Sequence, residues 1–298
     1  MTIQVHKRFI KKRTGQVVVH DHSKIISAIF RAQQSLGKGN EKLAVDYVLD
    51  HSSWALIVAG SAGESVVIND TLTWIKQYAF TYSDLRMYQT LKFDYEDFTD
   101  GNIYLLTPYD TVRGENVPQD APTNKANFEW AINSIGEFAD SDDQVLIFWT
   151  SHGQEEPFKL DVDSTWISVS EFDSNLDKIN CSEMIIIVEA CYSGALRESL
   201  DDESNRVMYF SSKANQTSKG WENDTHIGLI FSNATIRALD PDCNASDADT
   251  DNPPDNHVSM LEMFLFANAS VIDLTEDQDP QRWFGTNDDD EIYLGDYQ

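Results

Sequence analysis

Five short runs of apolar residues dominate the chain after its first fifty residues. Each is about as long as one strand, is rich in β-branched or aromatic side chains, and does not alternate with polar positions. The runs are Trp54–Ala59, Ile103–Thr107, Val145–Thr150, Met184–Glu189 and Val207–Ser211. Strands of this kind are buried on both faces, which is typical of a parallel sheet that lies between two layers of helices.

Helical patterns lie between these runs. Asn69 or Asp70 can cap a helix that continues to Phe80, and Thr123 or Asn124 can cap a second one. The second helix would place four apolar residues on one face: Phe128, Ile132, Ile135 and Phe138. Alternating strands and helices predict an α/β fold, a doubly wound and mainly parallel sheet with helices on both faces. In such sheets, functional sites form beyond the carboxyl ends of the strands.

The charge of the chain excludes several classes of protein. Among 298 residues there are 22 Lys and Arg against 50 Asp and Glu, a net charge of −28. This sign is wrong for a protein that binds nucleic acid over its whole surface, because binding there depends on neutralising phosphates. The hydrophobic content of 41% also argues against a wholly disordered acidic chain.

The location of the protein is predicted from what the sequence lacks. No run approaches the roughly 18 apolar residues of a membrane helix, and the basic N-terminus has no apolar core of a signal peptide. The three cysteines, Cys181, Cys191 and Cys243, cannot all pair. We therefore expect a cytoplasmic protein with at least one free thiol, and no membrane or nucleic-acid partner.

Charge also predicts how the chain is divided. Residues 1–50 hold nine Lys or Arg and four Asp or Glu, whereas residues 240–298 hold sixteen acids and one base, Arg282. Such asymmetry is typical of separate modules. We expect a basic N-terminal segment over residues 1–50, followed by a larger domain over residues 51–298 that ends in the acidic region of residues 240–298.

A histidine and a cysteine follow neighbouring strands of the predicted sheet. His152-Gly153 comes after the third run and Cys191 after the fourth. A helix beginning near Cys191 would favour its thiolate, and His152 could accept and return a proton. The backbone N–H groups of Gly153 and Cys191 are candidates for an oxyanion hole. A cysteine after a strand is also commonly a small buried hydrophobe, and a His-Gly pair commonly a turn, so both interpretations stay open here.

The residues around these two positions carry a family resemblance. Thr150-Ser-His-Gly153 and Glu189-Ala-Cys-Tyr-Ser-Gly194 resemble the His-Gly and Ala-Cys signatures of caspase-like cysteine peptidases, above all the family of the legumains and the GPI transamidase catalytic subunit. Trp54–Ser61 and Asn102–Leu106 resemble the first two strands of that family. The resemblance implies a caspase-like fold, a Cys191/His152 dyad with Gly153 in the oxyanion hole, and peptide-bond hydrolysis through an acyl-thioester, without a cofactor.

The resemblance also bears on the substrate, which would be a protein or peptide. Legumains carry an Arg-His pair after the first strand that helps bind the P1 side chain, whereas this chain has Glu64–Asp70; the Asp linked to ligation is here Ser151. Glu189 matches an acidic position of the P1 pocket, so an unpaired carboxylate there favours Lys or Arg. Ser212 and Lys213, after the fifth run, complete the predicted substrate-binding residues. Lys213 could instead neutralise Glu189 and favour Asn or Asp.

Two other kinds of protein remain compatible with these residues. One is a catalytically silent relative that serves as a binding or scaffolding module. The other is an acyltransferase or transpeptidase that uses the same Cys/His dyad. A buried, hydrogen-bonded Glu189 without any contact to substrate is likewise compatible with the sequence.

Residues 251–262 fit the spacing of a calcium loop. Asp251, Asp255, Ser259 and Glu262 stand at positions 1, 5, 9 and 12 of an EF-hand register, although position 3 is Pro253. We therefore consider a Ca²⁺ site there. The alternative is a solvated acidic loop in which Ser259 caps the following helix.

The basic N-terminal segment resembles the first half of an ATP-cone, the nucleotide-binding regulatory module of ribonucleotide reductases. Lys12, Arg13 and Lys24 stand at the matching positions, which implies a nucleotide as ligand. About half of that module's length is present. The alternative is a docking element whose basic side chains are solvated.

Overall fold

The chain divides into two units, Met1–Ser52 and Ser53–Gln298, which we describe separately. The computed structural model describes residues 8–11, 17–20, 53–61, 63–68, 71–95, 97–155, 159–162, 165–200, 205–222, 227–240, 248–250, 257–285 and 292–295. In the first unit, β1 (Arg8–Lys11) pairs antiparallel with β2 (Val17–His20). All further elements belong to the second unit.

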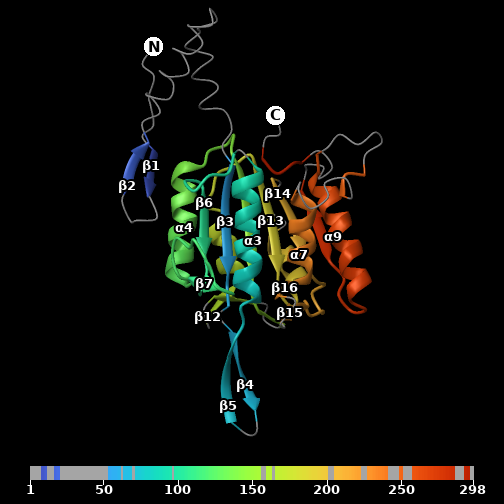
Figure 1. The fold of residues 1–298 in the computed structure, drawn as a ribbon. Helices are drawn as coiled ribbons and strands as arrows, with labels where there is room; N and C mark the ends of the chain where they lie inside the picture. Colours follow the sequence, from blue (N-terminus) through green and yellow to red (C-terminus); the bar gives the residue numbers. More distant parts are fainter. Residues whose placement is uncertain are drawn as a thin grey trace, which may run out of the picture. The chain divides into compact units, whose positions relative to one another are not determined.

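A six-stranded sheet forms the centre of the second unit (Figure 1). In spatial order its strands are β17 (Gln281–Phe284), β14 (Arg206–Phe210), β13 (Glu183–Glu189), β9 (Gln144–Thr150), β3 (Ser53–Ala59) and β6 (Ile103–Leu106). Within this sheet, β3, β6, β9, β13 and β14 are parallel to one another, and β17 is antiparallel to β14. The five predicted runs are these parallel strands, which confirms the mainly parallel sheet.

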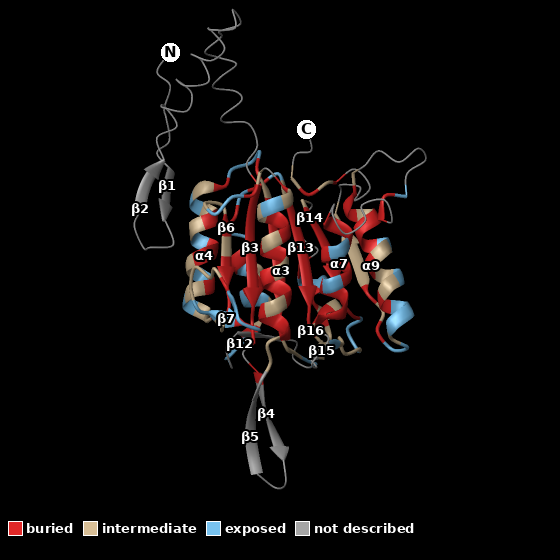
Figure 2. Ribbon diagram, viewed as in Figure 1, coloured by how far each residue is buried: buried red, intermediate tan, exposed pale blue. Residues whose placement is uncertain are grey.

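Alternate residues of each strand pack against different layers of helices. Leu146 and Phe148 of β9 pack with one layer, and Val145, Ile147 and Trp149 pack with the other. The first layer consists of α3 (Ala79–Asp94), α7 (Ile230–Leu239) and α9 (Met260–Leu274). The second consists of α4 (Lys125–Phe138), α5 (Val169–Leu176), η1 (Ser193–Leu196) and α6 (Arg197–Leu200). Figure 2 shows that the strands of the sheet are buried, and the two layers of helices confirm the predicted helices on both faces.

The helix predicted over residues 123–138 is confirmed, and its cap is the predicted asparagine. The Asn124 side chain accepts a hydrogen bond from the Asn127 backbone N–H at 2.9 Å, and α4 begins one residue after Asn124. This bond satisfies one of the N–H groups that the first turn of a helix leaves unpaired.

The helix predicted from Asn69 or Asp70 to Phe80 is wrong. Strand β4 (Gly63–Ile68) pairs antiparallel with β5 (Thr71–Lys76), with Ile68 opposite Thr71, and α3 starts only at Ala79. Figure 1 shows this hairpin extending beyond the carboxyl end of β3. The β-branched residues on both sides of Asn69-Asp70 favour strands, and a two-residue Asn-Asp link is compatible with a hairpin.

Short antiparallel strands surround the carboxyl edge of the sheet. They are β7 (Thr111–Val112) with β8 (Glu115–Asn116), β10 (Gly153–Gln154) with β11 (Lys159–Val162) and β12 (Thr165–Ser168), and β15 (Gly220–Glu222) with β16 (Ile227–Leu229). Among the described residues, no helix is long and apolar enough to cross a membrane.

The amino edge of the sheet is held by a buried arginine. Arg206, at the start of β14, is 2% exposed and donates to Asp173 Oδ1 at 2.7 Å, to Asp177 Oδ1 at 2.6 Å and to the Leu200 carbonyl at 3.4 Å. A buried guanidinium is stable only when its donors are satisfied in this way. The bonds fasten α5 and α6 to the strand.

Candidate active site

The ends of β9 and β13 bring the two predicted catalytic residues to one place. The strands are neighbours, with Thr150 opposite Glu189, and the Ser151 backbone N–H donates to the Glu189 carbonyl at 3.0 Å. His152 therefore follows one strand, and Cys191 the next, at the same edge of the sheet. The prediction that these residues share one site is consistent with this register.

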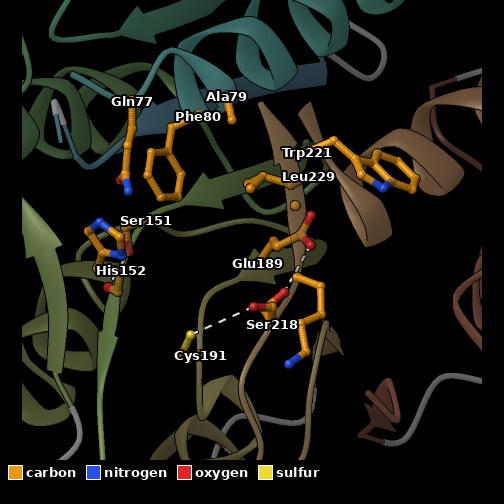
Figure 3. A pocket seen from close by; sticks show the side chains of 12 residues that line it. Gln77, Ala79, Phe80, Ser151, His152, Glu189, Cys191, Ser218, Trp221 and Leu229 are labelled. Carbon is orange, nitrogen blue, oxygen red and sulfur yellow. Dashed lines mark hydrogen bonds between the residues drawn. The ribbon is translucent and has the colours of Figure 1, made fainter. Parts of the chain in front are cut away.

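A pocket of about 260 Å³ opens at this edge. His152, Cys191 and Glu189 all contribute to its lining (Figure 3). Ser151, which follows β9, also lines it. The remaining lining residues come from the start of α3 and from the chain between β14 and α7: Gln77, Ala79, Phe80, Ser218, Lys219, Gly220, Trp221 and Leu229. The pocket thus combines a thiol, an imidazole and a carboxylate with apolar walls.

The Cys191 thiol is half-buried and contacts the loop after β14. Its Sγ donates to the Ser218 carbonyl oxygen at 3.8 Å. Burial raises the pKa of Cys191, the nearby Glu189 carboxyl raises it further, and Lys219 opposes both. The predicted lowering of this pKa by a helix is wrong, because Tyr192 is left-handed (φ 64°) and the chain continues into the short 3₁₀ helix η1 rather than into an α-helix that begins at Cys191.

His152 lies across the pocket from the loop that contacts Cys191. Its ring packs edge-on against Phe80, with the ring centroids 5.1 Å apart. Its Nε2 is buried and has no hydrogen-bond partner among the described residues. An imidazole nitrogen with a free position in a pocket can exchange a proton with a bound substrate.

Gly153 lies very close to the backbone of Cys191. A Cβ atom at this position would lie 1.9 Å from the Cys191 carbonyl oxygen and 3.3 Å from the Cys191 backbone nitrogen. Any side chain would therefore displace the backbone of Cys191. The glycine of the His-Gly motif is required by this contact.

Glu189 is a buried carboxylate in the pocket lining. It is 1% exposed and accepts from Ser218 Oγ at 2.9 Å, from the Phe231 N–H at 3.2 Å and from the Ser232 N–H at 2.5 Å. Burial raises the pKa of Glu189 to about 7, although these hydrogen bonds favour the ionised form. The carboxyl group is thus both hydrogen-bonded and part of the pocket.

A second buried acid, Asp84 of α3, lies close to Glu189. Asp84 accepts from Thr150 Oγ1 at 2.8 Å, and Thr150 is the strand partner of Glu189, about one strand spacing away. Burial, and to a lesser extent the Glu189 carboxyl, raises the pKa of Asp84, and Asp84 Oδ2 has no partner among the described residues. Sequence patterns missed Asp84 because it lies in the middle of a helix.

The other two predicted substrate-binding residues do not line the pocket. Ser212 is fully buried and donates from Oγ to the Ala190 carbonyl at 3.2 Å, so it supports the turn that holds Cys191. Lys213 forms an ion pair with Asp279. The alternative that Lys213 neutralises Glu189 is therefore wrong, because the Lys213 ammonium is paired with Asp279 of the C-terminal region.

Sequence patterns also missed the residues that complete the pocket wall. Ser218, Lys219 and Trp221 come from the loop and strand after β14, and Phe80 from the first turn of α3. The one available signal was the position of this loop at the same sheet edge as His152 and Cys191. None of these residues belongs to a recognisable motif.

The predicted calcium ligands are described only in part. Ser259 and Glu262 form a capping box at the start of α9, in which Ser259 Oγ accepts from the Glu262 N–H at 3.2 Å and Glu262 Oε2 accepts from the Ser259 N–H at 3.0 Å. Glu262 Oε1 accepts from the Thr250 N–H at 2.7 Å. Asp251 and Asp255 lie outside the described residues. No group of three or more His, Cys, Asp or Glu in the described part could hold a metal ion.

Comparison with known proteins adds a family to this geometry. The family model described as the peptidase C13 family matches residues 53–250. The chain belongs to the peptidase C13 family. This C13 protein is therefore a cysteine peptidase or a related caspase-like protein, and the predicted resemblance to the legumain and GPI transamidase family is confirmed.

The other comparisons add little for this C13 protein. A solved structure, caspase-1 from Spodoptera frugiperda, matches with 13% identity and a TM-score of 0.47, covering 79% of this chain and 87% of that chain. A search of curated proteins finds no match. No comparison supports the resemblance to an ATP-cone, and Lys12, Arg13 and Lys24 lie outside the described residues.

Proposed function

We propose that this C13 protein is a cysteine endopeptidase that cleaves peptide bonds through an acyl-thioester on Cys191. The observation that supports this most is the shared pocket at the carboxyl edge of the sheet. It is lined by a half-buried thiol, a buried carboxylate and an imidazole of which one nitrogen has no partner in the described part of the chain. Nucleophile and base in one cleft are the requirement for covalent catalysis.

The reaction proceeds in two steps. His152 takes the proton of the Cys191 thiol while Sγ attacks the carbonyl carbon, and the tetrahedral intermediate collapses as His152 gives the proton to the departing amine. Water then attacks the thioester, and hydrolysis restores the thiol. The N–H groups of Gly153 and Cys191 are proposed to bind the oxyanion, for which the close contact between these two backbones is suited.

The proposed P1 side chain is Lys or Arg, with Asn or Asp as the second choice. Glu189 supports this preference because it is the acid of the pocket lining. The Lys213 ammonium is paired elsewhere. Phe80 and Leu229 provide apolar walls for the stem of a long basic side chain.

A library of fluorogenic peptides that differ only at P1 tests both parts of the proposal. We expect turnover by the wild type, none above background by Cys191→Ala, and the highest kcat/KM for P1 Arg or Lys. Equal turnover by the wild type and Cys191→Ala would contradict the enzyme assignment. A preference for Asn over Arg would leave that assignment intact and overturn the basic P1 pocket.

One observation favours a second candidate, a silent binding module. Burial raises the pKa of Cys191, which disfavours the thiolate that attack requires. The library distinguishes the two, since a silent module would bind peptides without Cys191-dependent cleavage. An acyltransferase would instead transfer the acyl group to an added amine.

Three sequence predictions also stay proposals. They are Ca²⁺ at Asp251, Asp255, Ser259 and Glu262, a nucleotide at Lys12, Arg13 and Lys24, and a cytoplasmic location. A Ca²⁺ ion would have to share Glu262 with its capping box. Isothermal titration without heat in the millimolar range would overturn the ion, and a thermal-shift screen with ATP and dATP without any shift would overturn the nucleotide.

A further inference from the structure

One residue of the pocket wall, Ser218, contacts both functional groups of the site. Its carbonyl oxygen accepts from Cys191 Sγ at 3.8 Å, and its Oγ donates to Glu189 Oε1 at 2.9 Å. Figure 3 shows Ser218 between the thiol and the carboxylate. The position of this loop residue therefore sets where the thiol and the carboxylate lie relative to each other.

A buried glutamine from the acidic C-terminal region holds this loop. Gln278 is 3% exposed. Its Nε2 donates to the Ser211 carbonyl at 2.9 Å and to Ser218 Oγ at 3.3 Å, and its Oε1 accepts from the Lys219 N–H at 2.9 Å. One amide thus bonds both ends of the loop between β14 and β15, and no substitute of another shape could make all three bonds.

Two ion pairs flank this glutamine. Asp279 pairs with Lys213, and Asp277 pairs with Lys219 at 3.2 Å. Both pairs are partly exposed and contribute little, because solvent screens them. The buried amide matters more, since its removal leaves a buried carbonyl and a buried N–H without partners.

We propose that Gln278 is a positioning residue for the specificity pocket, acting through Ser218 on Glu189 and Cys191. The inference rests on the proposed peptidase function. It assigns a role to residues 277–279, which lie beyond the part of the chain that the family model matches. Part of the acidic C-terminal region is then a component of the site.

The test compares two variants of Gln278 with a matched control. Gln278→Ala removes all three bonds, and the isosteric Gln278→Glu keeps the acceptor for Lys219 but cannot donate to Ser211. Gln144→Ala is the control, because Gln144 makes the same kind of bonds, to Glu183, Tyr293 and Gly295, at the amino edge of the sheet. The measured quantity is the ratio of kcat/KM between the best P1 side chain and P1 Ala.

We expect this ratio to fall roughly tenfold in both Gln278 variants and to stay unchanged in Gln144→Ala. The ratio does not depend on how much of the protein is folded, so a merely structural role would not move it. An unchanged ratio in both Gln278 variants would overturn the role of Gln278. No Cys191-dependent turnover in the wild type would instead overturn the proposed function.

A second readout needs no activity. Amide hydrogen exchange at Lys219, whose N–H donates to Gln278, is expected to be faster in Gln278→Ala than in the wild type, and unchanged in Gln144→Ala. Equal exchange at Lys219 in all three proteins would show that Gln278 does not hold the loop, and would overturn the inference.

Discussion

The two edges of the central sheet differ in how fully some of their buried polar groups are hydrogen-bonded. At the amino edge, Arg206 satisfies its donors with two carboxylates and a carbonyl, and the Trp54 indole N–H donates to Asp143 at 3.1 Å. At the carboxyl edge, His152 Nε2 and Asp84 Oδ2 are buried and have no partner among the described residues.

This difference separates what stabilises the fold from what is available to a substrate. Buried polar groups in proteins are nearly always hydrogen-bonded, so those without partners call for an explanation. One of these groups, the His152 imidazole, lines the pocket that contains the thiol of Cys191, and the other, Asp84, lies next to Glu189.

The largest effect is expected from Gly153→Ala, at the carboxyl edge. The new Cβ would lie 1.9 Å from the Cys191 carbonyl oxygen, so the nucleophile must move. Displacement by about 1 Å can cost roughly a hundredfold, and we expect at least this loss in kcat/KM. The control is Gly136→Ala, whose Cβ would lie 2.6 Å from the Lys178 carbonyl oxygen, away from the pocket. Wild-type kcat/KM in Gly153→Ala would contradict the prediction.

Arg206→Ala, at the amino edge, is expected to lower the stability of the protein and to leave its kcat/KM nearly unchanged. The variant leaves Asp173 and Asp177 without their partner, and we expect the free energy of unfolding to fall by about 3 kcal/mol. Urea denaturation measures this change. Arg206→Lys, which keeps the charge but not the paired donors, should lose less. If kcat/KM of the folded Arg206→Ala protein fell as steeply as in Gly153→Ala, the separation of the two edges would not hold.

Glu189→Gln tests the acid of the pocket with little change in shape. The amide cannot attract a cation, so we expect the preference for P1 Arg over P1 norleucine to fall by about 2 kcal/mol. Comparing kcat/KM for the two peptides measures it. The matched variant is Glu171→Gln, an exposed acid on α5 outside the pocket lining, which should keep the wild-type preference. An unchanged preference in Glu189→Gln would exclude Glu189 from P1 recognition.

A smaller effect is expected from pH. Because burial raises the pKa of Glu189 to about 7, the carboxylate forms as pH rises through 7, and the preference for P1 Arg over P1 norleucine should rise with it.

The free energy of unfolding should change with pH in the opposite direction. An acid whose pKa is raised on folding stabilises the protein below its unfolded pKa, near 4.5, and this contribution is lost as pH rises to about 7. Both trends should be absent in Glu189→Gln, and their persistence there would assign them to another group.

The smallest effect is expected from Lys125→Ala, at neither edge. Lys125 pairs with Glu171 at 2.9 Å on the surface, where such pairs contribute at most about 1 kcal/mol. The hydrogen bond from Lys125 contributes most to lowering the pKa of Glu171 to about 2. Titration of Glu171 by NMR should therefore show a higher pKa in the variant. A loss of unfolding free energy comparable to that of Arg206→Ala would contradict this ranking.

The strands, and the position of His152 and Cys191 at one edge of the sheet, were predictable from sequence because they depend on local patterns. Continuous apolar runs identify strands that are buried on both faces, and the residue after each such strand lies at the carboxyl edge. The hairpin of β4 and β5 was missed because Asn69-Asp70 resembles a helix cap as well as a turn. The cap at Asn124, by contrast, was followed by a clear helical face.

The pocket wall was not predictable because it is made by contacts between distant segments. Asp84 meets Thr150 across 66 residues, and Gln278 meets Ser218 across 60. No periodicity or motif encodes such pairs. Lys213 was misassigned for the same reason, since its partner Asp279 comes from the C-terminal region.

Covalent labelling tests the central claim most directly. A peptidyl acyloxymethyl ketone with Arg at P1 should alkylate Cys191 in the wild type, detected by mass spectrometry of the peptide that contains it. The account predicts modification of Cys191 alone, much slower labelling in His152→Ala, and slower labelling by the matched reagent with norleucine at P1. Labelling that spares Cys191, or that proceeds at the same rate in His152→Ala and with either reagent, would contradict it.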